Sequence, residues 1–258
     1  MKKNSTFTKT YLVVIMIIIY IPILLTVIYS FNEAKLTSVW DGFSLKWYQE
    51  LFRDKDMAQA LVNSLILAFL SCTLSVIIGT LGALGMHRVK RKSNNFIEYI
   101  STLPIMIPEI ILGMVFLAVF SFMGLPFGLT TLVIAHTTFC VPYLFMMVKA
   151  RLVGMDESIQ DAARDLGASE IRVFLLVTLP MIRPAILSGM LLSFAMSFDD
   201  VVISIFVTGA RVNTLPIKIY TKLKTGVTPE INALAAVMLA ITIVIILAAE
   251  KIGKKKMA

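Results

Sequence analysis

The chain has 258 residues, of which 58% are hydrophobic and 16% are charged, and its formal net charge is +8. Soluble domains carry about 25% charged residues, so this composition excludes a soluble enzyme, a nucleic-acid-binding protein and a disordered tail. Cys72 and Cys140 lie inside apolar stretches. Two cysteines placed in this way are too few for a disulfide framework or a metal site.

Six apolar stretches follow one another along the chain, at about residues 11–31, 60–85, 97–123, 129–148, 181–209 and 231–249. Each is about as long as the roughly 20 residues that a helix needs to cross a bilayer. None alternates apolar and polar residues as a barrel strand does, so we expect an all-α membrane protein with six transmembrane helices. The first stretch is too long for a signal-peptide core and is expected to be retained. No linker divides the chain, so residues 1–258 are expected to form a single transmembrane domain.

The basic residues are distributed unevenly between the two sides of the expected bundle. The loops on one side, taken with both termini, carry twice as many Lys and Arg residues as the loops on the other side. Because basic loops stay in the cytoplasm, both termini are expected to be cytoplasmic. The positive charge is therefore a topology signal that faces the headgroups of a lipid bilayer, and it does not indicate a nucleic-acid partner.

The cytoplasmic loop at residues 149–180 mixes acidic, basic and apolar residues, unlike the other loops. Asp156 and Glu157 can start a short helix, and Gly167 supplies the positive φ that ends one. A second amphipathic piece is expected over residues 169–176, stopping before Pro180. This helix–glycine–helix elbow is either a docking surface for a cytosolic partner or a segment that packs on the protein's own helices.

The same loop carries a resemblance to a known family. Asp161-Ala162-Ala163 is followed after three residues by Gly167, and nine residues later by Val177-Thr178-Leu179-Pro180. This spacing resembles the EAA motif of ABC-importer permeases, E-A-A-x3-G-x9-I-x-L-P, with Asp in place of Glu and Val in place of Ile. Three further segments are similar to permeases of polyamine importers: Leu103–Glu109, Ser197–Val202 and Leu215–Tyr220.

The resemblance implies the type I ABC importer permease fold, with the loop at 149–180 forming the helix that couples to an ATPase. The coupling residues would be Asp161, Ala162, Ala163, Gly167, Leu179 and Pro180. The implied partners are a second homologous permease subunit, a cytosolic ATPase dimer and an external polyamine-binding protein, in a bacterial plasma (inner) membrane. The sequence contains no G-x-x-x-x-G-K-[ST], so we expect a chain that is not an enzyme, has no cofactor, and leaves ATP to its partner.

Three acidic residues fall well away from the ends of the expected helices, where ionisable groups are costly and usually functional. Glu109 lies near the centre of the third span, and Asp199 and Asp200 lie in the outer half of the fifth. On a continuous helix, Asp200 would share one face with small and polar residues, namely Gly189, Ser193, Ser197, Ser204 and Thr208. That face could line a water-filled path, or it could be a close contact between helices.

Two adjacent carboxylates in a low-dielectric site repel each other, and a polycationic ligand would remove that repulsion. Aromatic rings at Phe194, Phe198 and Tyr143 could add cation–π contacts. The expected substrate pathway therefore consists of Asp199, Asp200, Glu109, Ser197, Phe198 and Tyr143. The alternatives are that the aspartates pair with a basic residue of the partner permease and that Glu109 only bonds to hydroxyl groups of the fifth span.

Other polar residues have plainer explanations. His136 is expected to be a core histidine bonded to Thr137 or Thr138. Trp40, Trp47 and Tyr48 fit a membrane-interface belt, although they could also receive a binding protein. The basic turn at residues 215–230 could meet the acidic surface of such a protein.

The sequence thus predicts the permease subunit of an ATP-driven importer of polyamines such as spermidine and putrescine. One alternative is an ABC permease for another cationic solute or a metal chelate. A second is a proton-coupled secondary transporter that uses the three acids as a relay, although such carriers usually show two inverted halves. A third is a structural membrane subunit, which would leave the three acids unexplained.

Overall fold

The computed structural model describes residues 6–34, 39–88, 94–156, 158–210, 212–226 and 229–255. Within these ranges the regular elements are helices, accompanied by one isolated β-bridge between Asn32 and Phe43. The expected all-α fold is confirmed. Several residues behind the expected orientation and elbow lie outside these ranges: Lys2, Lys3, Lys35, Lys90, Arg91, Lys92, Glu157, Arg211 and Lys256.

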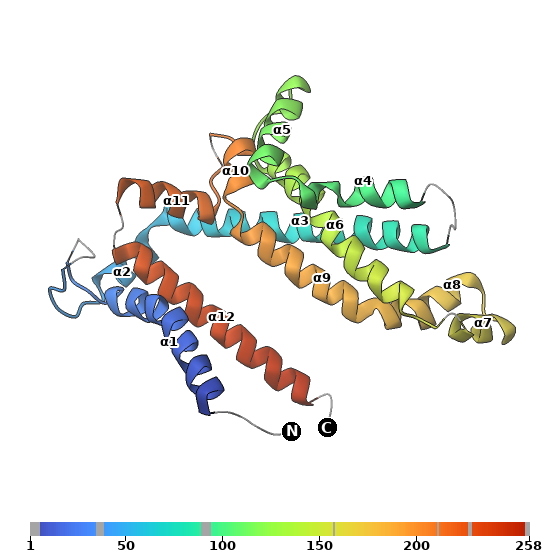
Figure 1. Cartoon of the computed structure of the whole chain (residues 1–258). Coiled ribbons are helices and arrows are strands. Elements are labelled where there is room, and N and C mark those ends of the chain that lie inside the picture. The colour runs from blue at the N-terminus through green and yellow to red at the C-terminus, as the bar shows by residue number, and fades with distance from the viewer. Residues whose placement is uncertain are drawn as a thin grey trace. The chain divides into compact units, whose positions relative to one another are not determined.

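The helices follow one another without any intervening sheet (Figure 1). In chain order they are α1 (Thr6–Tyr29), α2 (Lys46–Arg53), α3 (Lys55–Arg88), α4 (Asn94–Met106), α5 (Glu109–Phe122), α6 (Leu129–Val153), α7 (Ser158–Asp165), α8 (Glu170–Val173), the π-helix η1 (Phe174–Thr178), α9 (Leu179–Asp199), α10 (Val202–Val207), α11 (Leu215–Thr225) and α12 (Pro229–Lys255).

Length and composition identify the helices that can cross a membrane. Among the described residues these are Thr8–Tyr29, Lys55–His87, Leu129–Val153 and Glu170–Asp199. The bent pair α4–α5 makes a fifth if it counts as one span. The sixth expected span falls in α12, of which Pro229–Ile241 is a shorter apolar helix in the searched part of the chain.

Two expected spans are interrupted. The third is not one helix, because Phe96–Met106 and Glu109–Phe122 meet at an angle of 106°. Pro108 has an extended backbone there, with ψ of 134°, and a proline disfavours a helical conformation in the residue before it. The fifth is also not continuous, because α9 ends at Asp199 and α10 begins at Val202. The expected stripe from Gly189 to Thr208 is therefore divided between two helices.

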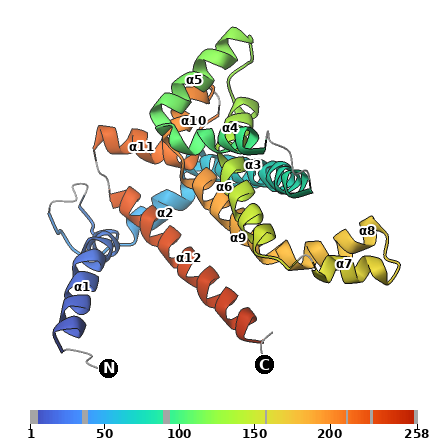
Figure 2. The same cartoon turned by 45° about the vertical axis from the view of Figure 1, so that its right-hand side comes forward.

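The chain divides into two compact units. The larger unit comprises Gln59–Lys218, and the terminal unit combines Met1–Ala58 with Ile219–Ala258. In the larger unit α6 packs along α9, α4 lies against α6, and α10 lies against α5 (Figure 2). Its two apolar cores centre on the first and second halves of α6, around Leu132 and Leu144 respectively, both fully buried.

Small residues let the helices of the larger unit approach closely. A Cβ atom on Gly79 of α3 would come within 3.1 Å of the backbone nitrogen of Phe145 in α6, and one on Gly189 of α9 would clash with Leu144. Ser193 and Ser197 continue the same face of α9 and are 0% and 2% exposed. Over this part of α9 the structure shows the closely packed helix contact, as small residues in membrane helices allow.

The terminal unit packs α1 and α2 against α12. Trp47 of α2 is only 6% exposed, and its indole N–H donates to the carbonyl of Asn32 at 2.8 Å. The expected place of Trp47 in an interfacial belt is therefore wrong, because its polar atom bonds inside the unit, whereas Trp40 is exposed. The expected basic turn is also partly neutralised, since Lys222 contacts Asp54 at 3.1 Å and Glu230 at 2.7 Å.

Candidate functional site

Two helix breaks bring the three acidic residues of the expected pathway together. Glu109 is the first residue of α5 after the Pro108 break, and Asp199 and Asp200 occupy the break between α9 and α10. These breaks border one pocket of about 430 Å³, lined by Glu109, Phe139, Ala195, Met196, Asp199, Asp200, Val201 and Val202. The pocket thus unites acids that lie 90 residues apart in the sequence. We call it the acidic pocket.

Asp200 is held firmly in the wall of the acidic pocket. Its Oδ1 accepts the backbone N–H of Ile203 at 3.2 Å, and its Oδ2 accepts that of Ser204 at 2.8 Å. Both donors belong to the first turn of α10, whose N–H groups have no partner within the helix. The side chain is only 6% exposed, so Asp200 both starts α10 and keeps its charge bonded.

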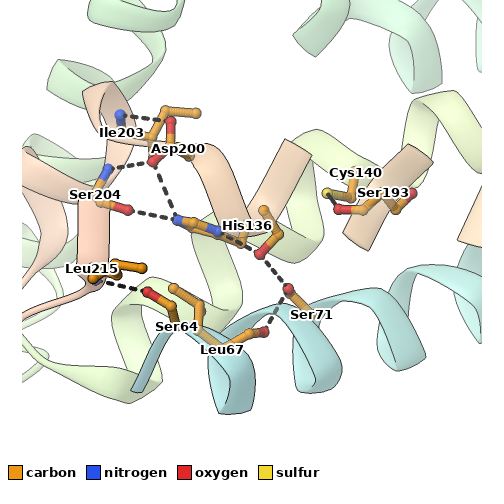
Figure 3. A network of polar contacts seen from close by, with 11 residues as sticks. Ser64, Leu67, Ser71, His136, Cys140, Ser193, Asp200, Ile203, Ser204 and Leu215 are labelled. Atoms are coloured by element: carbon orange, nitrogen blue, oxygen red, sulfur yellow. Dashed lines mark hydrogen bonds and ion pairs between the residues drawn. The ribbon is translucent and has the colours of Figure 1, made fainter. Parts of the chain in front are cut away.

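His136 of α6 joins Asp200 to a network of hydroxyl groups (Figure 3). Its Nε2 lies 3.4 Å from Asp200 Oδ2 and 3.0 Å from Ser204 Oγ, and its Nδ1 lies 2.8 Å from Ser197 Oγ. Ser197 in turn contacts Ser71 of α3 at 2.9 Å. His136 is a fully buried and bonded histidine as expected, but its partners are serines of α9 and α10 and not the expected Thr137 or Thr138.

Asp199 and Glu109 differ from Asp200 in their surroundings. Both are exposed, and in the part of the chain that the structure describes neither carboxylate has a hydrogen bond or an ion pair. The expected alternative, in which Glu109 bonds to hydroxyl groups of the fifth span, is not what the structure shows. The acidic pocket therefore presents two unneutralised carboxylates beside one that is already bonded.

The expected aromatic residues lie near the acidic pocket but do not line it. Phe194 and Phe198 stack on each other with ring centroids 6.0 Å apart, and Tyr143 is half-buried on α6. The aromatic residue in the wall is Phe139, which the sequence analysis missed. Its ring centroid lies 5.2 Å from that of His136, three residues earlier, so helical spacing from a buried histidine was the available signal.

The expected coupling loop forms an exposed elbow at the other end of α6. None of the residues of α7 is buried, and Leu166 is 89% exposed. The helix ends in a Schellman motif: Gly167 has a φ of +83°, its N–H donates to Arg164, and the N–H of Ala168 donates to Ala163. Asp161, Ala162 and Ala163 thus lie on a short, solvent-facing helix closed by the expected glycine.

Ion pairs brace the elbow. Arg164 contacts Asp161 within α7 and Glu170 at the start of α8, each at 2.7 Å. The hydrogen bond that Arg164 donates to Glu170, with a smaller one to Asp161, outweighs slight desolvation and raises the pKa of Arg164 above its ordinary value. The pair with Glu170 links α7 to the start of α8.

The helix in the second half of the coupling loop is longer than expected. The helix does not stop before Pro180 but runs without a break from Glu170 to Asp199, through the π-helix η1. Pro180 lies in the first turn of α9 and has no N–H, so it cannot close an ordinary i→i−4 bond to Leu176. Leu179 and Pro180 therefore connect the elbow directly to the helix that carries Ser197 and Asp199.

A site with several acidic residues could also bind a metal ion. Among the residues that the structure describes, no group of three or more His, Cys, Asp or Glu side chains could hold a metal ion. His136, which lies beside Asp200, is already bonded through both ring nitrogens.

Sequence comparison relates the chain to transport proteins. The family model described as binding-protein-dependent transport system inner membrane component matches residues 75–253. The spermidine/putrescine transport system permease protein PotC of Haemophilus influenzae is 38% identical over 96% of this chain and 96% of its own length. The putrescine transport system permease protein PotI of Escherichia coli is 43% identical over 86% of this chain and 81% of its own.

Solved structures share the fold at low sequence identity. A chain from a bacterial ABC transporter involved in the import of the acidic polysaccharide alginate aligns with a TM-score of 0.73 and 15% identity, covering 96% of this chain and 94% of that one. A chain of the MetNI methionine ABC transporter in an inward-facing conformation aligns with a TM-score of 0.64 and 20% identity, over 78% of this chain and 98% of that one. These similarities establish the fold alone.

Proposed function

Because this chain belongs to the family of binding-protein-dependent transport system inner membrane components, we propose that it is the permease subunit of an ATP-driven importer of polyamines, of the spermidine and putrescine class. The observation that carries the substrate class is the acidic pocket, where Glu109 and Asp199 have no hydrogen-bonded or ionic partner among the described residues. The names of the two relatives, which are 38% and 43% identical, support the same class.

The chemistry of the acidic pocket fits an alkylammonium chain. An ammonium group placed between Glu109 and Asp199 would neutralise charges that are otherwise costly inside a membrane protein. Phe139 offers an aromatic face worth about 0.5–2 kcal/mol to such a cation. Phe198 and Tyr143 do not line the pocket, and we assign them to the rest of the path that a long polyamine would follow. Asp200 and Ser197 contribute indirectly, because their polar atoms are bonded within the protein.

The exposed elbow is the proposed contact with the ATPase. Asp161, Ala162 and Ala163 lie on α7, and Gly167 sets the turn to α8. Since the helix continues through Leu179 and Pro180 to the acidic pocket, a movement of the elbow would be transmitted along α9 to Asp199. ATP would be bound by a cytosolic ATPase dimer, so this subunit needs no nucleotide site or cofactor.

The remaining partners complete an importer in a bacterial plasma (inner) membrane. A second, homologous permease subunit would close the transport path, and an external polyamine-binding protein would deliver the substrate. Selectivity would then be set mainly by the binding protein, because the permease site must also release its cargo. The acidic pocket needs only modest affinity for each ammonium group.

Uptake measurements on an Asp199→Asn variant test the proposal. Cells that lack polyamine uptake would receive the full set of subunits, and entry of labelled spermidine and putrescine would be measured against concentration. Loss of one charge–charge contact should raise the KM about tenfold, which corresponds to about 1.4 kcal/mol. The assembled amount of transporter should stay unchanged, because Asp199 has no bonded partner in the described part of the chain.

The matched control is Glu50→Gln, which removes an exposed carboxylate of α2 whose pair with Lys46 spans 4.0 Å. This variant should transport like the wild type, since such surface pairs contribute little. Unchanged spermidine and putrescine uptake by Asp199→Asn would refute the substrate role of the acidic pocket. Uptake that persists without the ATPase would instead favour a secondary transporter.

A further inference from the structure

His136 occupies a position that ordinary core packing does not require. The side chain is 0% exposed, yet both ring nitrogens contact polar groups of other helices. A buried polar side chain costs free energy unless it is fully bonded, so an apolar residue would fill the same space more cheaply. The network around it involves α3, α6, α9 and α10 (Figure 3).

The number of available protons decides which group donates in each hydrogen bond of this network. The hydroxyl of Ser71 donates its only proton to the carbonyl of Leu67 at 2.7 Å. In the contact between Ser71 and Ser197, the proton therefore comes from Ser197. Ser197 has then no proton left for the imidazole, so it accepts one from Nδ1–H of His136 at 2.8 Å. The ring is thereby fixed with its other nitrogen, Nε2, toward α10.

Nε2 meets the two groups that hold the helix break. Ser204 Oγ lies 3.0 Å away and Asp200 Oδ2 lies 3.4 Å away. Ser204 also donates its backbone N–H to the same carboxylate oxygen at 2.8 Å. Since Nδ1 carries the ring proton, Nε2 accepts the hydroxyl proton of Ser204. His136 therefore holds Ser204, and the backbone N–H of Ser204 holds Asp200.

We propose that His136 is a positioning residue: it holds Ser204, whose backbone N–H fixes Asp200 and with it the break between α9 and α10 that turns Asp199 toward the acidic pocket. This inference rests on the proposed function, because it assigns Asp199 to the substrate. His136 does not line the pocket itself, so it acts on polyamine binding only through Ser204 and Asp200.

Asn and Gln substitutions separate the two ring nitrogens. The amide of Asn reaches about as far as Nδ1, and the longer Gln reaches about as far as Nε2. His136→Gln can therefore keep a polar partner for the hydroxyl of Ser204, while His136→Asn keeps only the contact with Ser197. His136→Phe preserves the ring and its packing on Phe139 but removes both polar contacts.

Each variant would be measured in the complete importer, with the KM and the maximal rate of spermidine uptake per assembled complex. His136→Asn and His136→Phe should raise the KM about tenfold with a maximal rate close to the wild type, as expected for losing the buried hydrogen bond with Ser204. His136→Gln should recover most of the affinity. Equal KM values for the Asn, Gln and Phe variants would overturn the proposal.

A double-mutant cycle with Asp200→Asn tests whether His136 acts through Asp200. In the Asp200→Asn background, His136→Asn should raise the KM by less than about twofold, because the carboxylate that His136 positions is already absent. Independent, multiplying effects would contradict a positioning role. Should His136→Asn assemble poorly, Ser204→Ala would replace it, since this change removes the hydroxyl beside Nε2 and leaves the ring in place.

The two proposals fail in different ways. If Asp199→Asn leaves uptake unchanged, the proposed function of the pocket fails whatever the histidine variants do. If Asp199→Asn raises the KM but His136→Asn and His136→Phe do not, only the positioning role is refuted.

Discussion

Asp199 and Asp200 are neighbours in sequence but have opposite surroundings. The carboxylate of Asp200 accepts two backbone N–H groups and lies 3.4 Å from Nε2 of His136. The carboxylate of Asp199 is exposed in the acidic pocket and has no partner among the residues described. Since bonded charges stabilise a fold and unbonded ones are available to ligands, the two residues have different roles. Asp200 is bonded within the protein, and Asp199 is the residue that we propose to meet the substrate.

The difference between these two aspartates predicts different effects on stability. Asp200→Asn replaces one accepting oxygen by a donor that faces another donor, so the unfolding free energy should fall by about 1–3 kcal/mol. Amide hydrogen exchange should accelerate at Ile203 and Ser204, whose N–H groups bond to Asp200. Asp199→Asn is the matched control and should leave both quantities unchanged. Equal exchange rates in the two variants would contradict the assignment.

The elbow shows how one residue type fixes the shape of an element. Gly167 has a φ of +83°, and a Cβ added to it would meet no atom within 4 Å. Space therefore does not limit this position, and only the backbone conformation favours glycine. The amphipathic pattern of α7 and the Schellman ending together present an exposed helix with Leu166 at its tip.

The effect of a substitution at Gly167 on uptake should depend on how well the new residue tolerates a positive φ, and not on the size of its side chain. Asn tolerates the left-handed region, so Gly167→Asn should retain most of the uptake, whereas Gly167→Val should lose most of it. Gly167→Ala should fall between them, with a conformational cost of about 1 kcal/mol. ATP hydrolysis stimulated by the loaded binding protein would be measured on the purified complex. Similar activity of the Val and Asn variants would show that the turn is not needed for coupling.

At the scale of the whole molecule, the terminal unit is tied together by charges outside the membrane-spanning helices. Lys222 of α11 contacts both Asp54 and Glu230, and its side chain is 25% exposed. Burial acts to lower the pKa of Lys222, but the contacts with Glu230 and Asp54 prevail and raise it above its ordinary 10.5. Burial likewise acts to raise the pKa of Asp54, but the N–H of Met57 and the Lys222 ammonium lower it below 3.8.

These pKa shifts predict that the unfolding free energy is constant over a plateau of pH, with an acidic limit and a basic limit. The contribution of Asp54 is complete above about pH 4 and is lost as the pH falls through its lowered pKa, where the carboxylate is protonated. The contribution of Lys222 is complete below about pH 10.5 and is lost as the pH rises through its raised pKa. Lys222→Met should lower the plateau by roughly 1 kcal/mol and weaken both slopes.

Tryptophan fluorescence would follow this unfolding, because both tryptophans, Trp40 and Trp47, belong to the terminal unit. The control is Lys9→Met, which removes an exposed lysine of α1 that has no ion pair among the described residues. Its plateau should match that of the wild type. A Lys222→Met protein with the same pH profile as the wild type would show that the contacts with Asp54 and Glu230 are not stabilising.

The sequence predicted the local features of this protein well. Long apolar stretches gave the helices, because a bilayer leaves a chain no other way to satisfy its backbone. Spacing alone located the elbow at Asp161–Gly167, since a helix ending in glycine depends on neighbouring residues. The resemblance based on that spacing, with the three similar segments, led to the family that the comparisons confirm.

Only the tertiary structure decided how these parts meet. A continuous fifth helix was expected, but Asp200 caps the start of a new helix and so interrupts it. The partners of His136 come from residues more than 60 positions away, which local spacing cannot reveal. Apolar length and glycine turns are written into short segments, and the sequence by itself determined them. The acidic pocket depends on which helices lie side by side, and packing alone determines that.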